Sequence, residues 1–208
     1  MKKSMTITYE VDGSLYVNVT NRCTNRCSFC IRNNADGAYG SNSLWLIREP
    51  GVDEITESIL AHDLSKYGEI VFCGYGEPAM RLDVCREVAL RVKDKYKGVK
   101  IRINTNGQSD LIYSCDTSEM YRDAFDTVSI SLNSPTANGY DDICHSVYGI
   151  EAFDSILNFA KNVKNHVQNI MFSVVKEYIS DEELALCYAL SQKIGVPLRV
   201  RTYIGPKN

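Results

Sequence analysis

The sequence predicts an α/β fold, a single domain over residues 1–208 built as an open, partial (β/α)6 barrel of parallel strands with the last helix missing. Six apolar runs recur with helical sequence between them, the pattern of a parallel sheet made of strand–helix–strand units. Polar and glycine-rich residues follow these runs, where parallel α/β folds place their ligands. The sequence ends after the sixth run, so we expect too few strands for a closed eight-stranded barrel.

The first two predicted strands are residues 15–19 and 70–73. The first runs into a cysteine-rich loop, and a longer loop containing Trp45 then leads to a helix predicted over about residues 52–67. The second strand ends in a Gly-Tyr-Gly-Glu-Pro turn, after which apolar residues recur at helical spacing.

The third and fourth predicted strands are residues 99–103 and 127–132. The third ends in Asn-Thr-Asn-Gly, and a short helix is expected near residues 119–124. The fourth stops at Asn133, and a longer helix is predicted over about residues 152–166.

The fifth predicted strand, residues 170–175, precedes a helix that begins with Ser180 as its N-cap. Three acidic residues follow in the first turn, where the helix dipole favours negative charge. The sixth strand, residues 197–203, carries Arg199 and Arg201. Alternate residues of a strand share one face, so both arginines point either into the barrel toward an anionic group or outward into solvent.

Composition excludes several classes of protein. An apolar content of 44% and a charged content of 24% are those of an ordinary globular domain. No apolar stretch approaches the ~20 residues that a membrane helix needs, and a formal net charge of −3 gives no general attraction to nucleic acid. The chain starts without an apolar cleavable leader, so we expect a cytoplasmic protein with reduced cysteines.

The most informative local pattern is a loop with three cysteines, Cys23, Cys27 and Cys30. Closely spaced thiolates suit an iron–sulfur cluster, and three ligands for four irons leave one iron open to a small molecule. Structural zinc is disfavoured because no second pair of ligands stands at a suitable spacing. A disulfide framework is disfavoured by the expected compartment.

These residues resemble the signature loop of the radical S-adenosylmethionine (SAM) superfamily. The resemblance extends to the turn at residues 74–78 and to residues 104–107 and 131–133 after the third and fourth strands. It is closest to a subgroup called TatD-associated radical SAM proteins, in the Cys-Thr-Asn-Arg-Cys, Cys-Gly-Tyr-Gly-Glu-Pro and Asn-Thr-Asn-Gly sequences. The family implies a partial TIM-like barrel, and the subgroup implies a functional link to a TatD-type nuclease.

The resemblance also implies the cofactors and their contacts. Cys23, Cys27 and Cys30 would hold a [4Fe-4S] cluster whose open iron binds SAM, and reductive cleavage of SAM would yield a 5′-deoxyadenosyl radical that abstracts hydrogen. Glu77 would support the turn or the cation. The remaining contacts are Phe29 near the adenine, the turn residues Gly74, Tyr75 and Gly76 at the methionine amino group, and Asn104, Asn106, Ser131 and Asn133 at the ribose hydroxyls and the carboxylate.

Other features have no such assignment. The fifth strand lacks both glycines of the family pattern, which leaves the adenine contacts there open. Cys85 and Cys187 are predicted to be core residues, whereas Cys115 and Cys144, in loop-like sequence, receive no role. Trp45 is expected to anchor its loop by packing.

The substrate, a small molecule or a peptide, is not predicted, and no catalytic residue is identified; the reductant implied is flavodoxin or ferredoxin. Three alternative functions remain: an activating enzyme that places a glycyl radical on a partner protein, a non-catalytic iron–sulfur or SAM-binding module, and an electron-transfer protein. The last requires a fourth protein ligand to close the cluster.

Overall fold

The computed structural model describes residues 2–203 as a seven-stranded sheet in which the strand order follows the chain. Six strands are parallel and correspond to the six predicted ones: β2 Ser14–Val17, β3 Ile70–Phe72, β4 Ile101–Thr105, β5 Thr127–Ser131, β6 Asn169–Val175 and β7 Leu198–Arg201. The first and last strands do not pair, so the sheet stays open. The predicted partial barrel is confirmed.

One strand was not predicted. β1, Thr8–Val11, pairs antiparallel with β2 through a two-residue turn made of Asp12 and Gly13. Both turn residues have positive φ, 46° and 75°, the geometry that Asp-Gly favours in tight hairpins. The sequence signal for this hairpin was therefore the Asp-Gly pair, which lies between two segments of alternating polar and apolar residues.

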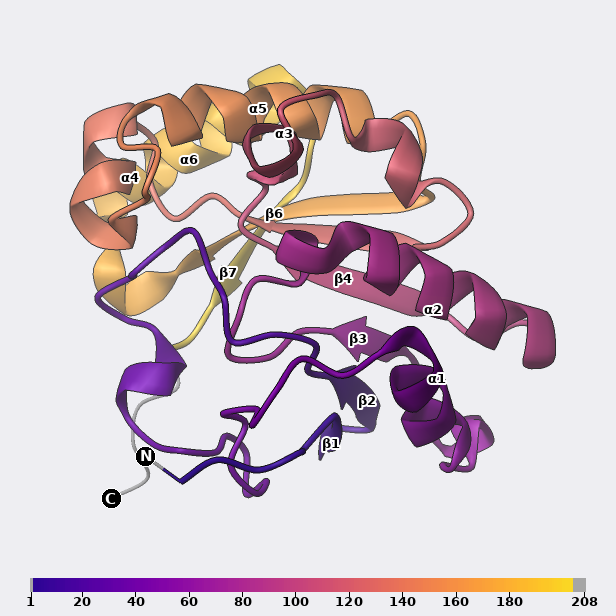
Figure 1. Cartoon of the computed structure of the whole chain (residues 1–208). Helices are drawn as coiled ribbons and strands as arrows, with labels where there is room; N and C mark the ends of the chain where they lie inside the picture. Colours follow the sequence, from indigo (N-terminus) through magenta and orange to yellow (C-terminus); the bar gives the residue numbers. More distant parts are fainter. Residues whose placement is uncertain (1, 204–208) are drawn as a thin grey trace.

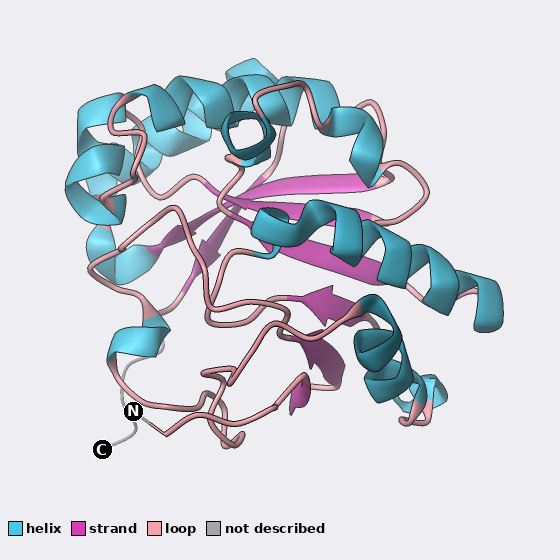
Figure 2. Cartoon of the chain, viewed as in Figure 1, coloured by secondary structure: helices cyan, strands magenta, loops and turns pink. Residues whose placement is uncertain are grey.

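The helices cover one face of the curved sheet (Figure 1). They are α1 Val52–Leu60, α2 Leu82–Lys95, α3 Ser109–Tyr113, α4 Ala137–Cys144, α5 Glu151–Val163 and α6 Asp181–Ile194. Figure 2 shows that the segment between β2 and α1 is mostly loop. No helix within residues 2–203 is both long and apolar enough to cross a bilayer.

Three helical predictions need correction. The short helix expected near residues 119–124 is a 3-10 turn, Ser118–Tyr121. The helix predicted over residues 52–67 ends at Leu60, and a separate 3-10 turn, Leu64–Lys66, follows because the Asp63 side chain accepts a hydrogen bond from Ser65 N. The sequence around Cys144, expected to be a loop, forms the end of α4. By contrast, Ser180 caps α6 as predicted.

The core has two parts. The larger lies between the sheet and its helices and includes Cys85 and Cys187, both fully buried as predicted. The smaller lies beneath the long loop, where Trp45 packs edge-on against Tyr75 at 5.2 Å between ring centroids. Trp45 is therefore an anchor of this loop, as expected.

Candidate functional site

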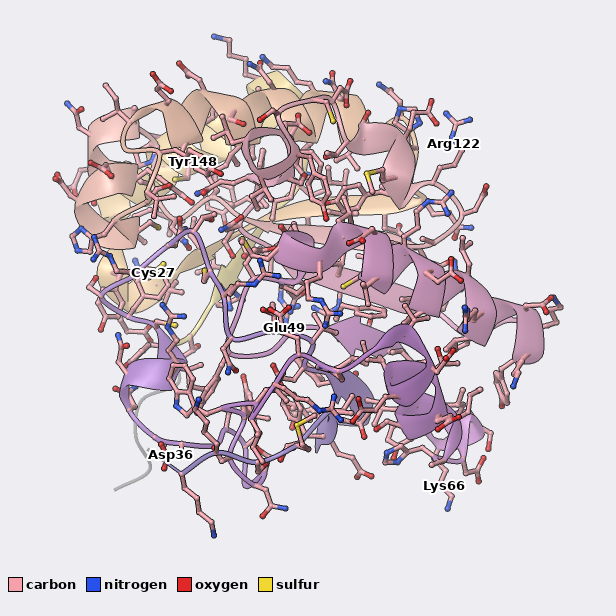
Figure 3. All side chains as sticks on the ribbon, viewed as in Figure 1. Cys27, Asp36, Glu49, Lys66, Arg122 and Tyr148 are labelled. Atoms are coloured by element: carbon pink, nitrogen blue, oxygen red, sulfur yellow. The ribbon has the colours of Figure 1, made fainter. Side chains whose placement is uncertain are left out.

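All twelve predicted site residues line two adjoining cavities at the carboxyl ends of the parallel strands. The cavities have volumes of about 190 and about 600 Å³. Figure 3 shows Cys27 at this end of the molecule and Arg122 at the opposite end. The smaller cavity contains Cys23, Cys27, Phe29, Gly76, Glu77, Asn104, Asn106, Ser131 and Asn133. The larger contains Cys30, Gly74 and Tyr75, and shares Phe29 and Asn104.

The cysteine loop lies against the end of α4 and is held there by backbone hydrogen bonds. Arg26 N donates to Cys144 O at 2.9 Å, and Ser28 N donates to Ile143 O at 3.0 Å. On the other side of the loop, Val147 N donates to Thr24 O at 2.9 Å. These bonds fix the path of the chain that presents the three thiols.

A network of buried side-chain hydrogen bonds also holds the cysteine loop in place. Asn25 Nδ2 donates to the Tyr140 hydroxyl at 2.9 Å, and Gln108 Nε2 donates to both Asn25 Oδ1 and the Tyr140 hydroxyl. Ser146 completes the network by donating to Gln108 Oε1. Asn25, Gln108 and Tyr140 are buried, so their polar groups need these partners, and the network ties the loop to α4.

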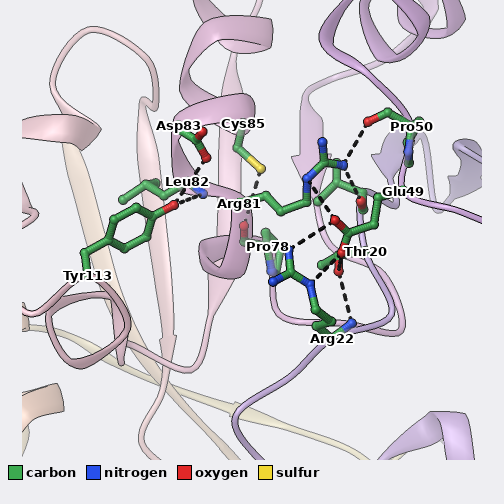
Figure 4. Close-up of polar contacts among 11 residues, drawn as sticks. Thr20, Arg22, Glu49, Pro50, Pro78, Arg81, Leu82, Asp83, Cys85 and Tyr113 are labelled. Carbon is green, nitrogen blue, oxygen red and sulfur yellow. Dashed lines mark hydrogen bonds and ion pairs between the residues drawn. The ribbon is translucent and has the colours of Figure 1, made fainter.

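The chain just before Cys23 is attached to the beginning of α2 (Figure 4). Glu49 accepts hydrogen bonds from Thr20 and from Arg22, the latter at 2.7 and 3.1 Å. Arg81 Nε lies 3.5 Å from the same carboxylate, and its guanidinium donates to Val19 O. This arrangement fixes where the cysteine loop begins.

The turn after β3 touches the cysteine loop directly. Glu77 N donates to Arg22 O at 2.8 Å. A side chain at Gly76 would place its Cβ 2.3 Å from Thr20 O and 2.6 Å from Arg22 O, both backbone atoms. Glycine is needed here because two backbone segments approach closely.

We therefore expect Gly76→Ala to displace the cysteine loop and to lower the iron content after anaerobic reconstitution at least severalfold. The control is Gly68→Ala, because an added Cβ at Gly68 meets nothing within 4 Å. Iron and sulfide analysis of both variants checks the prediction. Wild-type iron content in Gly76→Ala would contradict it.

The Glu77 side chain is fully occupied by protein donors. Oε1 accepts from Ala79 N at 3.0 Å and from the Thr105 hydroxyl at 2.7 Å, while Oε2 accepts from Asn106 N at 2.7 Å. Burial raises the pKa of the Glu77 carboxyl, and the three donors act in the opposite direction. Of the two expected roles, this geometry favours support of the turn.

Two other predicted residues also direct their side chains to protein groups. The Tyr75 hydroxyl donates to Ala35 O at 2.7 Å, and its ring is buried in the smaller core. Asn106 Nδ2 donates to the Thr24 hydroxyl, and its Oδ1 accepts from Gln108 N. Both residues line the cavities, as predicted, but their side chains are hydrogen-bonded to protein groups of the cavity wall.

Asn133 differs from these residues. It is buried, it has a left-handed backbone with φ of 58°, and its Oδ1 has no hydrogen-bond partner in residues 2–203. A buried, unpaired amide oxygen is costly in a folded protein. Ser131, the last residue of β5, lines the same cavity. These two are suited to contact a bound molecule.

The three thiols suit a cluster better than a single ion. In the part of the chain described, no three His, Cys, Asp or Glu side chains converge on one metal position. A [4Fe-4S] cluster does not require such convergence, since each thiolate binds a different iron. Burial raises the pKa of Cys23 to about 12, and metal coordination supplies the positive charge that favours the thiolate. The donor set therefore fits an iron–sulfur cluster.

Arg199 and Arg201 both line the two cavities, which resolves their direction in favour of the barrel interior. The cavities also share Cys73 and Arg102, which sequence reasoning did not select. Cys73 lies just before the glycine-rich turn and Arg102 lies on β4, two residues before Asn104. The only signal for Cys73 was its position at the end of a strand, and the only signal for Arg102 was that it shares a strand face with Asn104.

The chain matches known proteins at three levels. A sequence model described as the Radical SAM superfamily matches residues 17–188. A tungsten-containing aldehyde ferredoxin oxidoreductase cofactor-modifying protein from Pyrococcus furiosus is 27% identical over 170 residues, which cover 77% of this chain and 43% of that protein. The chain thus spans less than half the length of this relative.

Solved structures share the fold. SuiB from Streptococcus suis bound to SAM superposes with a TM-score of 0.67 at 14% identity, covering 93% of this chain and 41% of that one. Native anSMEcpe with bound AdoMet and Cp18Cys peptide gives a TM-score of 0.64 at 21% identity, covering 93% of this chain and 51% of that one. With a family match over most of its length, the chain belongs to the radical SAM superfamily, whose cofactors are a [4Fe-4S] cluster and SAM.

Proposed function

We propose that this protein is an enzyme that binds a [4Fe-4S] cluster through Cys23, Cys27 and Cys30 and reductively cleaves SAM. The observation that carries this proposal is that the cysteine loop and the turn after β3 contact each other and together line the two adjoining cavities at the strand ends. When bound, the cluster and SAM supply a 5′-deoxyadenosyl radical for hydrogen abstraction. The protein's own residues bind and orient the cofactors and the substrate, and they exclude water.

The proposed residue roles follow from the contacts. The three cysteines hold the cluster. Gly74 and Gly76 let the turn pack closely against Asn18 and the chain before Cys23, and the turn lies beside the cavities, where its backbone can face SAM. Phe29 offers an aromatic surface for the adenine from the wall between the two cavities, where its ring packs against Tyr178 at 5.1 Å. The remaining proposed contacts are the polar side chains of Asn104, Ser131 and Asn133, while Tyr75, Glu77 and Asn106 position the turn and the loop.

The Asn133→Gly variant is expected to bind SAM about threefold to tenfold more weakly, because one hydrogen bond to the cofactor is lost. Glycine tolerates the positive φ at this position, so the backbone is not strained. Asp123→Gly is the control, since Asp123 also has positive φ but is exposed and outside both cavities. Equilibrium binding of SAM to the reconstituted proteins checks this; unchanged affinity in Asn133→Gly would remove Asn133 from the contacts.

The proposed activity is tested by anaerobic reduction of the reconstituted protein with SAM, followed by chromatography. We expect 5′-deoxyadenosine and methionine to form with dithionite or with reduced flavodoxin or ferredoxin, the proposed donors. A cluster-loaded protein that releases neither product would contradict enzymatic cleavage and favour a binding module.

A protein or peptide substrate is the second candidate. Two fold relatives carry peptides in their structures: SuiB with the precursor peptide SuiA, and anSMEcpe with the Cp18Cys peptide. The larger cavity of this chain reaches the surface at Tyr39, an exposed lining residue. Transfer of a radical to a partner would be detected by electron paramagnetic resonance (EPR) of candidate partner proteins after turnover.

We also propose membership of the TatD-associated subgroup, on the three sequence turns that resemble it. A functional link to a TatD-type nuclease follows from that proposal alone. The link is supported if deletion of either gene gives the same phenotype, and it is contradicted if the two deletions give unrelated phenotypes.

A further inference from the structure

Two arginines on the last strand, Arg199 and Arg201, are not among the proposed cofactor contacts. Arg199 and Arg201 alternate along β7 and both line the wall shared by the smaller and larger cavities. Arg199 is exposed, whereas Arg201 is half-buried. Two guanidinium groups on one strand face therefore border the same internal space.

The charges of these arginines are not balanced by the surrounding protein. The third arginine of the wall, Arg102, is paired with Glu69 at 2.8 Å and also contacts Asn104 Oδ1. In residues 2–203, neither Arg199 nor Arg201 forms an ion pair, and the buried Nε of Arg201 has no hydrogen-bond partner. Burial lowers the pKa of Arg201. A buried donor of a charged group without a partner is costly, so the site is suited to an anion.

The other groups facing the pair do not balance its charge. Glu77, in the lining of the smaller cavity, accepts from three protein donors and forms no ion pair with Arg199 or Arg201. The acidic side chain in the lining of the larger cavity is Asp12, which belongs to the turn of the first hairpin and forms no ion pair with either arginine. Cys73 lies between the two cavities, and burial raises the pKa of its thiol. It is therefore a neutral neighbour, not a counter-ion.

The remainder of the larger cavity is aromatic. Tyr9 and Tyr16 lie 5.3 Å apart between ring centroids, and Tyr16 and Tyr39 lie 6.5 Å apart. The Tyr9 hydroxyl donates a hydrogen bond to Cys73 O, so the ring presents mainly its apolar face to the cavity. A cavity of about 600 Å³ has the size of ordinary small-molecule sites. The size and lining of this cavity suit a small molecule that has an apolar or aromatic part next to an anionic group.

We propose that Arg199 and Arg201 bind the oxyanion of a small organic substrate, a carboxylate or a phosphate, whose body packs among Tyr9, Tyr16 and Tyr39 in the larger cavity. Guanidinium groups recognise both anions through paired hydrogen bonds. This inference rests on the proposed function, because it places the substrate beside the residues assigned to SAM. Five of the twelve predicted cofactor residues also line the larger cavity, so the cofactors take up part of it; the part lined by Tyr9, Tyr16 and Tyr39, none of them a predicted cofactor residue, is the part proposed for the substrate.

The test uses the anaerobically reconstituted protein saturated with SAM, with benzoate and inorganic phosphate as probes. We expect at least one probe to bind wild type and to bind Arg199→Gln/Arg201→Gln about tenfold or more weakly, with cluster content and SAM affinity within threefold of wild type. The control is Arg48→Gln/Arg91→Gln, which removes the same charge from exposed arginines outside both cavities. Preference for one probe identifies the anion.

Three outcomes would overturn the inference. Equal binding by the two double variants would show that only net charge matters. Loss of SAM affinity with an intact cluster would assign the arginines to the cofactor carboxylate. A wild type that binds SAM but neither probe refutes this inference alone, whereas a wild type that does not bind SAM refutes the proposed function and the substrate role with it.

Discussion

The Cys27→Ser variant is expected to lose the iron–sulfur cluster and all formation of 5′-deoxyadenosine. Serine removes the soft sulfur ligand, and only Cys23 and Cys30 remain on the loop. We expect that the neighbouring thiol of Cys144, which interacts with the Cys27 side chain, does not replace it. Cys144 is buried at the end of α4, and its Sγ also accepts from Asn133 Nδ2 at 3.5 Å.

Two matched variants distinguish ligands from neighbours. Cys115→Ser changes an exposed cysteine outside both cavities, and Cys144→Ser changes the thiol beside Cys27. Both are expected to keep at least most of the iron, because three thiolates suffice for an open cluster. Iron analysis and the cluster's visible absorption decide the matter. Loss of the cluster in Cys144→Ser, with retention in Cys27→Ser, would assign the ligands differently.

The Glu77→Gln variant is expected to be destabilised and to hold the cluster poorly. Each carboxylate oxygen accepts from a backbone N–H, that of Ala79 or that of Asn106. Whichever way a glutamine amide is placed, its NH₂ group faces one of these donors. A buried donor left unpaired costs roughly 1–3 kcal/mol, so we expect the free energy of unfolding to fall by about that amount.

Glu57→Gln is the control for Glu77→Gln, since Glu57 is exposed on α1 and lines neither cavity at the strand ends. Chemical denaturation of the two reconstituted variants under argon gives the comparison. Equal stability of Glu77→Gln and wild type would show that the carboxylate does not brace the turn.

The sequence predicted the parallel part of the fold because each strand is a short apolar run followed by a polar turn. All residues of β3 are buried, for example, and the turn at Gly74 begins two residues after it ends. The β1 strand was missed because its alternating pattern is short and only the Asp12-Gly13 turn marked it. The end of α1 was misplaced because the apolar periodicity continues into a separate 3-10 turn, which Asp63 caps.

The sequence predicted where the candidate residues lie but not the contacts of their side chains. Local spacing located the cysteines and the turns, and all twelve residues lie around the two cavities. Spacing cannot show that Asn106 is engaged by Thr24, 82 residues earlier, or that Asn133 keeps an unpaired oxygen. Nor can it fix the direction of Arg201, which depends on how β7 pairs with β6. These properties depend on contacts between distant segments.

The central claim is that three cysteines hold a cluster with one iron open to SAM. It is tested most directly by EPR of the reduced, reconstituted protein before and after addition of SAM. We predict a [4Fe-4S]⁺ signal whose g values shift when SAM is added, and no such signal in Cys27→Ser. A wild-type cluster signal that is identical with and without SAM would contradict the account.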